Sequence, residues 1–434
     1  MEFLYRGVLN GEPGILLTFE EQADALRRNA RTMGWDLEAF EQAGTLILLH
    51  VDVPTDVVQS GEFDIGGLLA ILSGQIRSIG ARRIVIDAAD VLLRLFRDPH
   101  REEAQLVTLH NWLLAQDQTA VLTVKTSGEA SEAMHRLEYL TDCVLRLDHR
   151  VQGQVSTRRL RVLKYRGSAF LSNEYPYVIT PKGLVLLPIS NIALTARALG
   201  PRFPTGAVGL DALLGGGFFE GSSIVIGGGS GVGKTILACS IATAASARGE
   251  RVLYISFEES VESLASAVRS VGIRLYEAVD SGNLQVLTSI PEAMGLEDHL
   301  WRLFQALESF RPRHVVVDAI SACQRIGSES AAFEFLVRLL IHCKALGITC
   351  IFLNQVDPQH AVHQISGVGI SSLTDALLVL DQDWPDIDHR RRMLIVKVRG
   401  SGHSHGWNPF EITDTGLAFR DPASASSARR RGTQ

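Results

Sequence analysis

The sequence repeats itself along almost its whole length, and this repetition limits the possible folds more than any other feature. Blocks of the first half recur in the same order in the second: 15–21 as 252–259, 81–92 as 312–323, 140–148 as 373–381, 158–168 as 391–401, and 175–184 as 408–417. The last three pairs are each 233 residues apart. So long a period predicts a tandem duplication of one domain rather than a solenoid of short repeats.

Each copy alternates short apolar, β-branched runs with amphipathic helical stretches. In the second copy we expect strands at 222–228, 251–258, 284–289, 314–319, 349–354 and 376–381, and helices at 236–248, 260–272, 296–310 and 330–347. Apolar strands that alternate with helices are typical of a parallel sheet covered on both faces. The sequence therefore predicts two tandem α/β domains with mostly parallel sheets.

The repeated blocks and the composition between them indicate the domain limits. We expect a first domain at 1–187, a linker at 188–203 that begins with proline and has little strand pattern, and a second domain at 204–420. Residues 421–434 are rich in serine, alanine and arginine, and we expect this tail to be disordered.

The charge balance argues against a protein that coats nucleic acid. The chain has 42 Lys and Arg against 48 Asp and Glu, a net charge of −6, whereas binding along a phosphate backbone needs a basic surface. We find no apolar run of about 18 residues that would span a membrane, and no signal-peptide pattern at the first residues. The five cysteines are scattered, which is typical of reduced thiols. We therefore expect a cytoplasmic protein that binds no membrane.

The segment GGSGVGKT at 228–235 matches the phosphate-binding motif G-x-x-x-x-G-K-[ST]. It follows a predicted strand and opens a predicted helix, which is the context that this motif requires. The glycines let backbone amides surround phosphate oxygens, Lys234 reaches the β- and γ-phosphates of ATP, and the Thr235 hydroxyl is a ligand of Mg²⁺. The residues expected to contact the nucleotide here are Gly228, Ser230, Gly231, Val232, Gly233, Lys234 and Thr235.

Carboxylates stand at the ends of two other apolar strands. Asp318 ends the run HVVVD, where a ligand for a Mg²⁺-bound water belongs, although an aspartate there can also cap the following turn. Glu258 and Glu259 end the run RVLYISFEE, and adjacent strand residues point to opposite faces. One of them can act as general base on the attacking water or hydroxyl; the alternative is a solvated strand end.

Lys397 and Arg399 lie two residues apart in a predicted strand and therefore project from one face. Two cations on one face, with no carboxylate between them, can contact a γ-phosphate, either in the same chain or in the next subunit. The alternative is a solvated basic edge strand.

The first copy has no phosphate loop. Lys234 precedes Glu258 by 24 residues, so a lysine equally far before Glu20, the counterpart of Glu258, would fall before Met1. The part that is lacking includes the strand that lies at the centre of such a sheet. Because Glu20, Glu21, Asp87, Lys164 and Arg166 persist, we favour an N-terminally truncated copy over a relic that packs without binding ATP.

Taken together, these residues resemble the KaiC family of RecA-like ATPases and autokinases. The likeness rests on 205–235, the FEES strand, HVVVDAISA, ISSLTDALLVL and VKVRGSGH in the second copy, and on FLYRGVLNGEPGILLTFEE, ARRIVIDA and LKYRGSAFLSNEYPYVIT in the first. It covers essentially residues 2–418. The resemblance implies two tandem RecA-like P-loop domains, the first incomplete, and a two-tiered homohexamer with ATP at its subunit interfaces. It also implies slow ATP hydrolysis and autophosphorylation in the C-terminal tier.

The resemblance assigns roles to individual residues. The implied catalytic residues are Lys234, Glu258, Glu259 and Asp318, and the implied metal ligands are Thr235, Glu258 and Asp318. Beyond the phosphate loop, the implied nucleotide contacts are Arg391, Lys397, Val398, Arg399, Ser401 and His403. The implied phosphorylation sites are Ser371 and Ser372. Ser372 stands where the best-known members carry threonine, and Val271 replaces an aromatic residue beside the adenine. Without the resemblance, the hydroxyl pair at 371–372 would be read as an ordinary turn.

The sequence also bears on the partners of the chain and on two alternative functions. The resemblance implies KaiB-like or response-regulator and histidine-kinase partners, whereas the short C-terminal segment disfavours control of the KaiA type. One alternative is a RecA-like DNA-dependent ATPase, which would need basic loops that the segment after Asp318 lacks. Another alternative is a non-enzymatic scaffold that uses nucleotide only to assemble. Comparing the ATP turnover of Glu258→Gln with that of wild type would distinguish such a scaffold from an ATPase.

Overall fold

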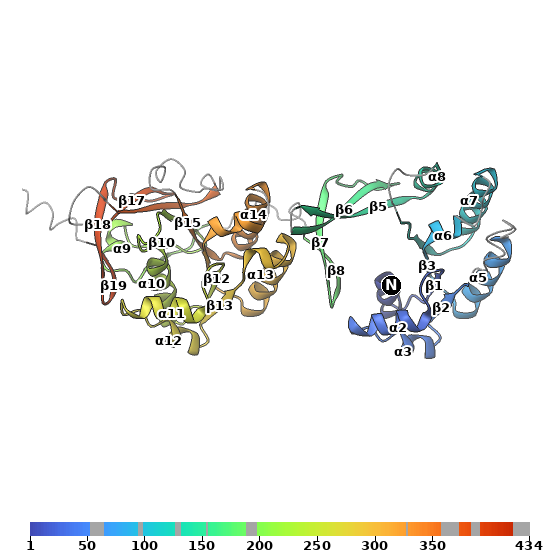
Figure 1. Cartoon of the computed structure of the whole chain (residues 1–434), viewed down its shortest axis with the longest axis horizontal. Coiled ribbons are helices and arrows are strands. Elements are labelled where there is room, and N and C mark those ends of the chain that lie inside the picture. The colour runs from blue at the N-terminus through green and yellow to red at the C-terminus, as the bar shows by residue number, and fades with distance from the viewer. Residues whose placement is uncertain are drawn as a thin grey trace, which may run out of the picture. The chain divides into compact units, whose positions relative to one another are not determined.

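The chain forms two compact units. The computed structural model describes residues 1–52, 65–93, 99–125, 132–152, 155–187, 198–326, 329–356, 373–382 and 391–419, which excludes the predicted tail and most of the predicted linker. One unit comprises Met1–Asp148 with Arg159–Leu186, and the other His149–Arg158 with Leu187–Gln434. Each unit is built of helices packed on sheets (Figure 1).

The second unit contains a nine-stranded sheet in the order β13-β12-β14-β15-β11-β16-β17-β18-β19. Its strands are β11 (Ser223–Gly228), β12 (Val252–Ser256), β13 (Leu284–Thr288), β14 (His314–Asp318), β15 (Thr349–Gln355), β16 (Ala376–Gln382), β17 (Arg391–Val398), β18 (Trp407–Thr413) and β19 (Gly416–Phe419). The pairs from β13 to β16 are parallel and those from β16 to β19 antiparallel. A small ladder joins β9 (Arg202–Phe203) and β10 (Phe218–Phe219).

Helices cover both faces of this sheet (Figure 1). They are α9 (Leu210–Leu213), α10 (Lys234–Ala247), α11 (Val261–Arg269), α12 (Leu275–Asp280), α13 (Leu296–Phe310) and α14 (Glu329–Leu346), with 3-10 turns η1 (Pro291–Ala293) and η2 (Ile320–Ile326). Tyr254, Val316 and Ile351 pack in one core with α10, α11 and α12, while their strand neighbours face α14. The strands are buried on both sides, and the predicted α/β class with mostly parallel sheets is confirmed.

The first unit repeats this architecture with one difference. Its helices are α1 (Glu2–Leu9), α2 (Ala23–Thr32), α3 (Leu37–Gln42), α5 (Ile65–Ile79), α6 (Ala89–Leu93), α7 (Pro99–Leu114) and α8 (Glu132–Leu140). Its strands are β1 (Gly14–Thr18), β2 (Leu46–His50), β3 (Arg83–Asp87), β4 (Thr119–Leu122), β5 (Cys143–Gln152), β6 (Val155–Tyr165), β7 (Glu174–Thr180) and β8 (Gly183–Leu186). They form two separate four-stranded sheets, β2-β1-β3-β4 and β5-β6-β7-β8. None of the described helices of either unit is both long and apolar enough to cross a bilayer.

The two sheet orders show where the copies differ. Aligned by the repeat, β2, β1, β3 and β4 correspond to β13, β12, β14 and β15, and β5 to β8 correspond to β16 to β19. In the second unit β11 pairs with both β15 and β16 and joins the two halves. Among the described residues of the first unit no strand stands in this position, so β4 and β5 do not pair.

Leucines of the first unit are exposed where their counterparts in the second are buried. Leu145 on β5 is 56% exposed, whereas Leu378, its counterpart on β16 beside β11, is 0% exposed. Leu184 and Leu186 on β8 are exposed as well, but Leu417 and Phe419 on β19 pack in the core with α10. The exposed surface of the first unit therefore corresponds to the surface that β11 and α10 cover in the second.

Because Leu378 is buried and Leu145 is exposed, replacing each leucine by alanine should have unequal effects on the free energy of unfolding. Leu378→Ala should lower the free energy of unfolding of the second unit by about 2–5 kcal/mol, because it leaves a cavity in a packed core. Leu145→Ala should change the stability of the first unit by no more than about 0.5 kcal/mol, as is usual for exposed sites. Urea titration followed by circular dichroism measures both values. Equal losses would mean that Leu145 is covered in solution.

Candidate active site

The phosphate-binding motif connects a central strand to a helix, as predicted. Strand β11 ends at Gly228 and α10 begins at Lys234. Gly231 and Gly233 have φ angles of 75° and 107°, in the left-handed region that favours glycine. A Cβ on Gly228 would lie 2.4 Å from the carbonyl oxygen of Leu380. The loop therefore requires its glycines, and the N-terminus of α10 adds partial positive charge beside it.

The side chain of Lys234 folds back over this loop. Its Nζ donates hydrogen bonds to the carbonyl oxygens of Gly228 (2.9 Å) and Gly229 (2.6 Å). Burial lowers the pKa of Lys234, while the carboxylates of Asp318 and Glu258 oppose that shift. The ammonium thus lies within the loop, where the lysine of a phosphate loop contacts phosphate oxygens.

Thr235 and Asp318 meet, although they come from α10 and β14. The Thr235 hydroxyl donates to Oδ2 of Asp318 at 3.0 Å, and the phenol of Tyr254 donates to the same oxygen at 2.7 Å. Burial raises the pKa of Asp318, while the two hydrogen bonds act in the opposite direction. Sequence reasoning missed Tyr254, whose only signal is a tyrosine at a position that the strand pattern would fill with an aliphatic residue.

The donor set of Thr235 and Asp318 fits Mg²⁺. No cluster of three or more His, Cys, Asp and Glu side chains occurs among the described residues, so a cation would not be held by such a cluster alone. Mg²⁺ is usually bound by one or two protein oxygens together with substrate phosphates and water. A hydroxyl and a buried carboxylate, 3.0 Å apart beside the phosphate loop, supply those protein oxygens.

The structure separates the two adjacent glutamates. Oε1 of Glu258 lies 3.8 Å from Nη1 of Arg325, whose Nε lies 2.9 Å from Oε1 of Glu292. Glu259 instead accepts a hydrogen bond from the Ser263 hydroxyl of α11 at 2.8 Å and lies directly before Ser260, the N-cap of that helix. Glu258 is thus the glutamate whose charge acts on Lys234. Arg325 is a second residue that sequence reasoning missed, because its contact depends on how η2 folds back toward β12.

Except for Arg391, the second group of predicted nucleotide residues lies at the opposite edge of the same sheet. Because β17 runs antiparallel to β16, its last residues return to the edge where β11 begins. There Lys397 Nζ donates to the Thr374 carbonyl at 2.6 Å, and Ser401 accepts from Arg202. Burial and the charge of Arg399 lower the pKa of Lys397.

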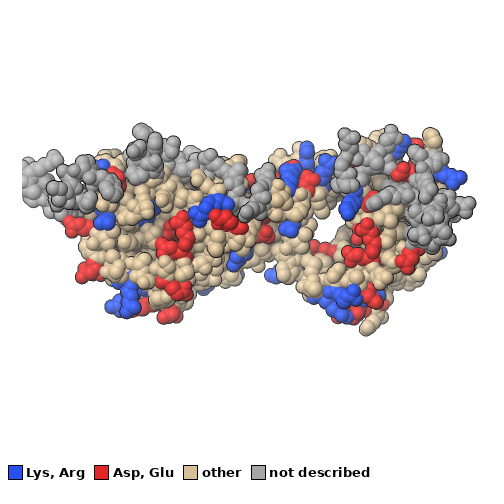
Figure 2. Space-filling view, in the orientation of Figure 1, with Lys and Arg blue, Asp and Glu red and all other residues tan. Residues whose placement is uncertain are grey.

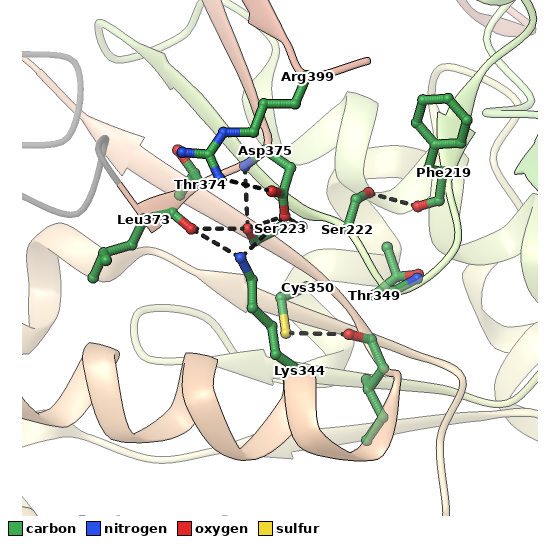
Figure 3. Close-up of polar contacts among 12 residues, drawn as sticks. Phe219, Ser222, Ser223, Lys344, Thr349, Cys350, Leu373, Thr374, Asp375 and Arg399 are labelled. Atoms are coloured by element: carbon green, nitrogen blue, oxygen red, sulfur yellow. Dashed lines mark hydrogen bonds and ion pairs between the residues drawn. The ribbon is translucent and has the colours of Figure 1, made fainter. Parts of the chain in front are cut away.

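Asp375 fixes this second edge (Figure 3). Its carboxylate accepts hydrogen bonds from the backbone N–H (2.9 Å) and the hydroxyl (2.7 Å) of Ser223, and it lies 3.1 Å from Lys344 Nζ and 3.5 Å from Arg399 Nη1. Burial alone would raise the pKa of Asp375, but the Ser223 hydrogen bonds and Lys344 outweigh it and lower that pKa. The start of β11 and the basic residues after β17 are thereby tied together.

The other predicted residues occupy varied places. His403 Nδ1 donates a hydrogen bond to the carbonyl oxygen of the adjacent Ser404 at 2.9 Å. Arg391 begins β17 opposite Gln382, at the phosphate-loop edge. Val232 and Val398 bury their side chains in the core. Ser371 and Ser372 lie outside the described residues.

The fold and site define a tandem P-loop ATPase of the RecA-like type, with the phosphate loop in the second copy. The family model described as "ATPase: KaiC" matches residues 1–191 and 203–424. The chain belongs to the KaiC ATPase family.

Curated relatives agree with this membership. The circadian clock protein KaiC2 of Synechocystis sp. (strain ATCC 27184 / PCC 6803 / Kazusa) is 34% identical over 422 residues, which cover 96% of this chain and 74% of the relative. The circadian clock oscillator protein KaiC of Synechococcus elongatus (strain ATCC 33912 / PCC 7942 / FACHB-805) is 31% identical over 425 residues, 97% of this chain and 82% of the relative.

Lys234→Ala should weaken ATP binding about 10- to 100-fold, because hydrogen bonds to a charged group contribute about 1.5–3 kcal/mol. Equilibrium titration with a fluorescent ATP analogue measures the dissociation constant. Lys182→Ala, which removes an exposed lysine of the first unit, is the matched control and should bind as wild type. An unchanged dissociation constant for Lys234→Ala would contradict the assignment of the loop.

Proposed function

We propose that the second copy binds and hydrolyses Mg²⁺·ATP, and that the chain phosphorylates itself on Ser371 and Ser372 within a ring of six copies. One observation carries this proposal: the predicted site residues stand at two opposite edges of one sheet. Strand β11 has the phosphate loop at its end and Ser223 at its start. At about 3.3 Å per residue these edges are roughly 17 Å apart, so the two groups complete one site only if they come from two chains.

The chemistry at the phosphate-loop edge is phosphoryl transfer. The loop amides and Lys234 would hold the β- and γ-phosphates, and Thr235 with Asp318 would hold Mg²⁺, which supplies charge neutralisation on the phosphates. Glu258, beside Lys234, would accept the proton of the attacking water or hydroxyl. The ion pair with Arg325 holds the Glu258 carboxylate at this edge.

Lys397 and Arg399 would stabilise the transferring phosphoryl group of the neighbouring chain. They stand at the Ser223 edge of their own sheet, away from their own phosphate loop. Cations supplied across an interface in this way stabilise transition-state charge. Ser401 and His403 would contact the same neighbouring nucleotide, because they follow Arg399 directly in the chain.

The two serines would receive phosphate from the neighbouring chain. Ser372 is bonded to Leu373, whose carbonyl oxygen accepts a hydrogen bond from Lys344 at 3.0 Å at the Ser223 edge. In-line transfer requires the hydroxyl within about 3–3.5 Å of the phosphorus. Because Leu373 stands at the edge away from the loop of its own chain, we propose that the phosphate comes from the neighbouring chain. Each phosphate would add about −1.5 to −2 charges beside Lys344, Lys397 and Arg399.

The proposal extends to the cellular location and the partners of the chain. We infer signalling of the clock type in the cytoplasm, with KaiB-like or response-regulator and histidine-kinase partners. The names of the relatives and the five free cysteines support this reading. On the face seen in Figure 2, basic and acidic side chains gather in small mixed groups, which does not favour the DNA-dependent alternative.

Mixing two inactive variants tests the shared site. Arg399→Ala and Lys234→Ala each damage every site of a uniform ring, but a mixed ring places both defects in some sites and leaves others intact. Partial ATPase activity should therefore return on mixing, as measured by phosphate release. Uniform rings of each variant are the controls. Mixed rings, verified by mass, that stay inactive would contradict a site shared between chains.

Incubation with γ-labelled ATP tests the kinase activity. Wild type should become labelled at 371 and 372, whereas Ser371→Ala/Ser372→Ala should lose the label and still hydrolyse ATP, because the phosphate loop and Glu258 are intact. Mass spectrometry of the peptides locates the phosphates. Equal labelling of the double variant, or no label on wild type after a day, would leave an ATPase without this kinase activity.

A further inference from the structure

Tyr254 is a buried polar group that the proposed chemistry does not use. Its side chain is 0% exposed in the core between β12 and α10. The phenol donates at 2.7 Å to Oδ2 of Asp318, the oxygen that also accepts from Thr235 at 3.0 Å. Two donors on one carboxylate oxygen fix the rotation of the carboxylate about its Cβ–Cγ bond, because moving Oδ2 would break both hydrogen bonds.

The fold does not need this hydroxyl. Aligned on the repeated Phe-Glu-Glu, the first copy carries Leu16 at the position of Tyr254, and Leu16 is buried in the same way. The repeated aspartate there, Asp87, accepts a hydrogen bond from the hydroxyl of Thr123, which directly follows the neighbouring strand β4. A buried hydroxyl without a partner would cost about 1–3 kcal/mol, so the tyrosine is tolerated because Asp318 accepts its hydrogen bond.

We propose that Tyr254 is a positioning residue for the Mg²⁺ site of the second copy. Held at Oδ2 by Tyr254 and Thr235, Asp318 keeps Oδ1 as its oxygen for the cation or for water bound to it. Tyr254 touches neither substrate nor cation and acts only through Asp318. This inference rests on the proposed binding of Mg²⁺·ATP. Groups that orient a metal-binding residue in this way change metal affinity about 10- to 100-fold when they are removed.

The test is the Mg²⁺ dependence of Tyr254→Phe, which removes the hydroxyl and keeps the ring. The concentration of free Mg²⁺ that half-saturates binding of a fluorescent ATP analogue should rise about tenfold, while binding of the analogue in EDTA should equal that of wild type. Tyr276→Phe, which removes a hydroxyl from a 47% exposed tyrosine on α12, is the matched control and should leave both values unchanged.

A double substitution separates positioning from packing. In an Asp318→Asn background the hydroxyl should no longer matter, so adding Tyr254→Phe should change the Mg²⁺ requirement less than twofold. A purely structural hydroxyl would lower the melting temperature and leave the Mg²⁺ requirement at the wild-type value, which would overturn the proposal. If Tyr254→Phe is insoluble, Tyr254→Leu, which copies the first unit, replaces it; insolubility of both would assign the hydroxyl to the fold and overturn the proposal too.

The same measurements distinguish an error in the role of Tyr254 from an error in the proposed binding of Mg²⁺·ATP. If wild type binds the analogue with Mg²⁺ and Tyr254→Phe has the same Mg²⁺ requirement, only the role of Tyr254 falls. If wild type shows no binding with or without Mg²⁺, the proposed function falls, and the role of Tyr254 with it.

Discussion

The pairing of β11 with β15 on one side and β16 on the other is the interaction on which the rest of the structure depends. It joins a parallel half-sheet to an antiparallel one. It also sets the phosphate loop at one edge and the Ser223–Asp375 contact at the other. The first unit has both half-sheets and no such strand among its described residues, and there they remain two sheets. In the second unit β11 therefore makes the sheet continuous and leads directly into the phosphate loop.

The same strand accounts for a difference in electrostatics between the copies. Asp375 and Asp142 are equivalent, and each lies beside an arginine, at 3.5 and 3.4 Å. The side chain of Asp375 is 11% exposed and that of Asp142 is 71% exposed, because only Asp375 has a serine at the start of a neighbouring strand. Ion pairs between exposed groups contribute about 0–1 kcal/mol. The carboxylate of Asp375 is thus anchored within its unit, whereas in the first unit Arg166 is held chiefly by its hydrogen bond to the Tyr139 carbonyl at 2.7 Å.

The sequence predicted those parts of the structure that depend on local pattern. The repeat, the apolar strands and the glycine spacing were enough to place two α/β units, the phosphate loop and the carboxylates at strand ends. Contacts that depend on sheet register were out of reach: Ser223 meets Asp375 across 152 residues, and Tyr254 meets Asp318 across 64. Neither pair carries a spacing that a sequence pattern can reveal. The division of the predicted nucleotide residues between two edges also follows from strand direction, which composition does not encode.

That division determines how copies of the chain can cooperate. Each chain offers a phosphate loop at one edge and cations at the other, so an interface that uses both must be head-to-tail, and head-to-tail interfaces close into rings when the rotation permits. The two edges are ends of the same strand, β11, which Ser223 fixes through Asp375 to Arg399 and which Gly228 continues into the loop. In the proposed ring, a displacement of β11 along its axis would therefore alter a chain's hold on its own nucleotide and on its neighbour's together. A rigid strand shared by both proposed sites is a physical element through which one site would bias the next.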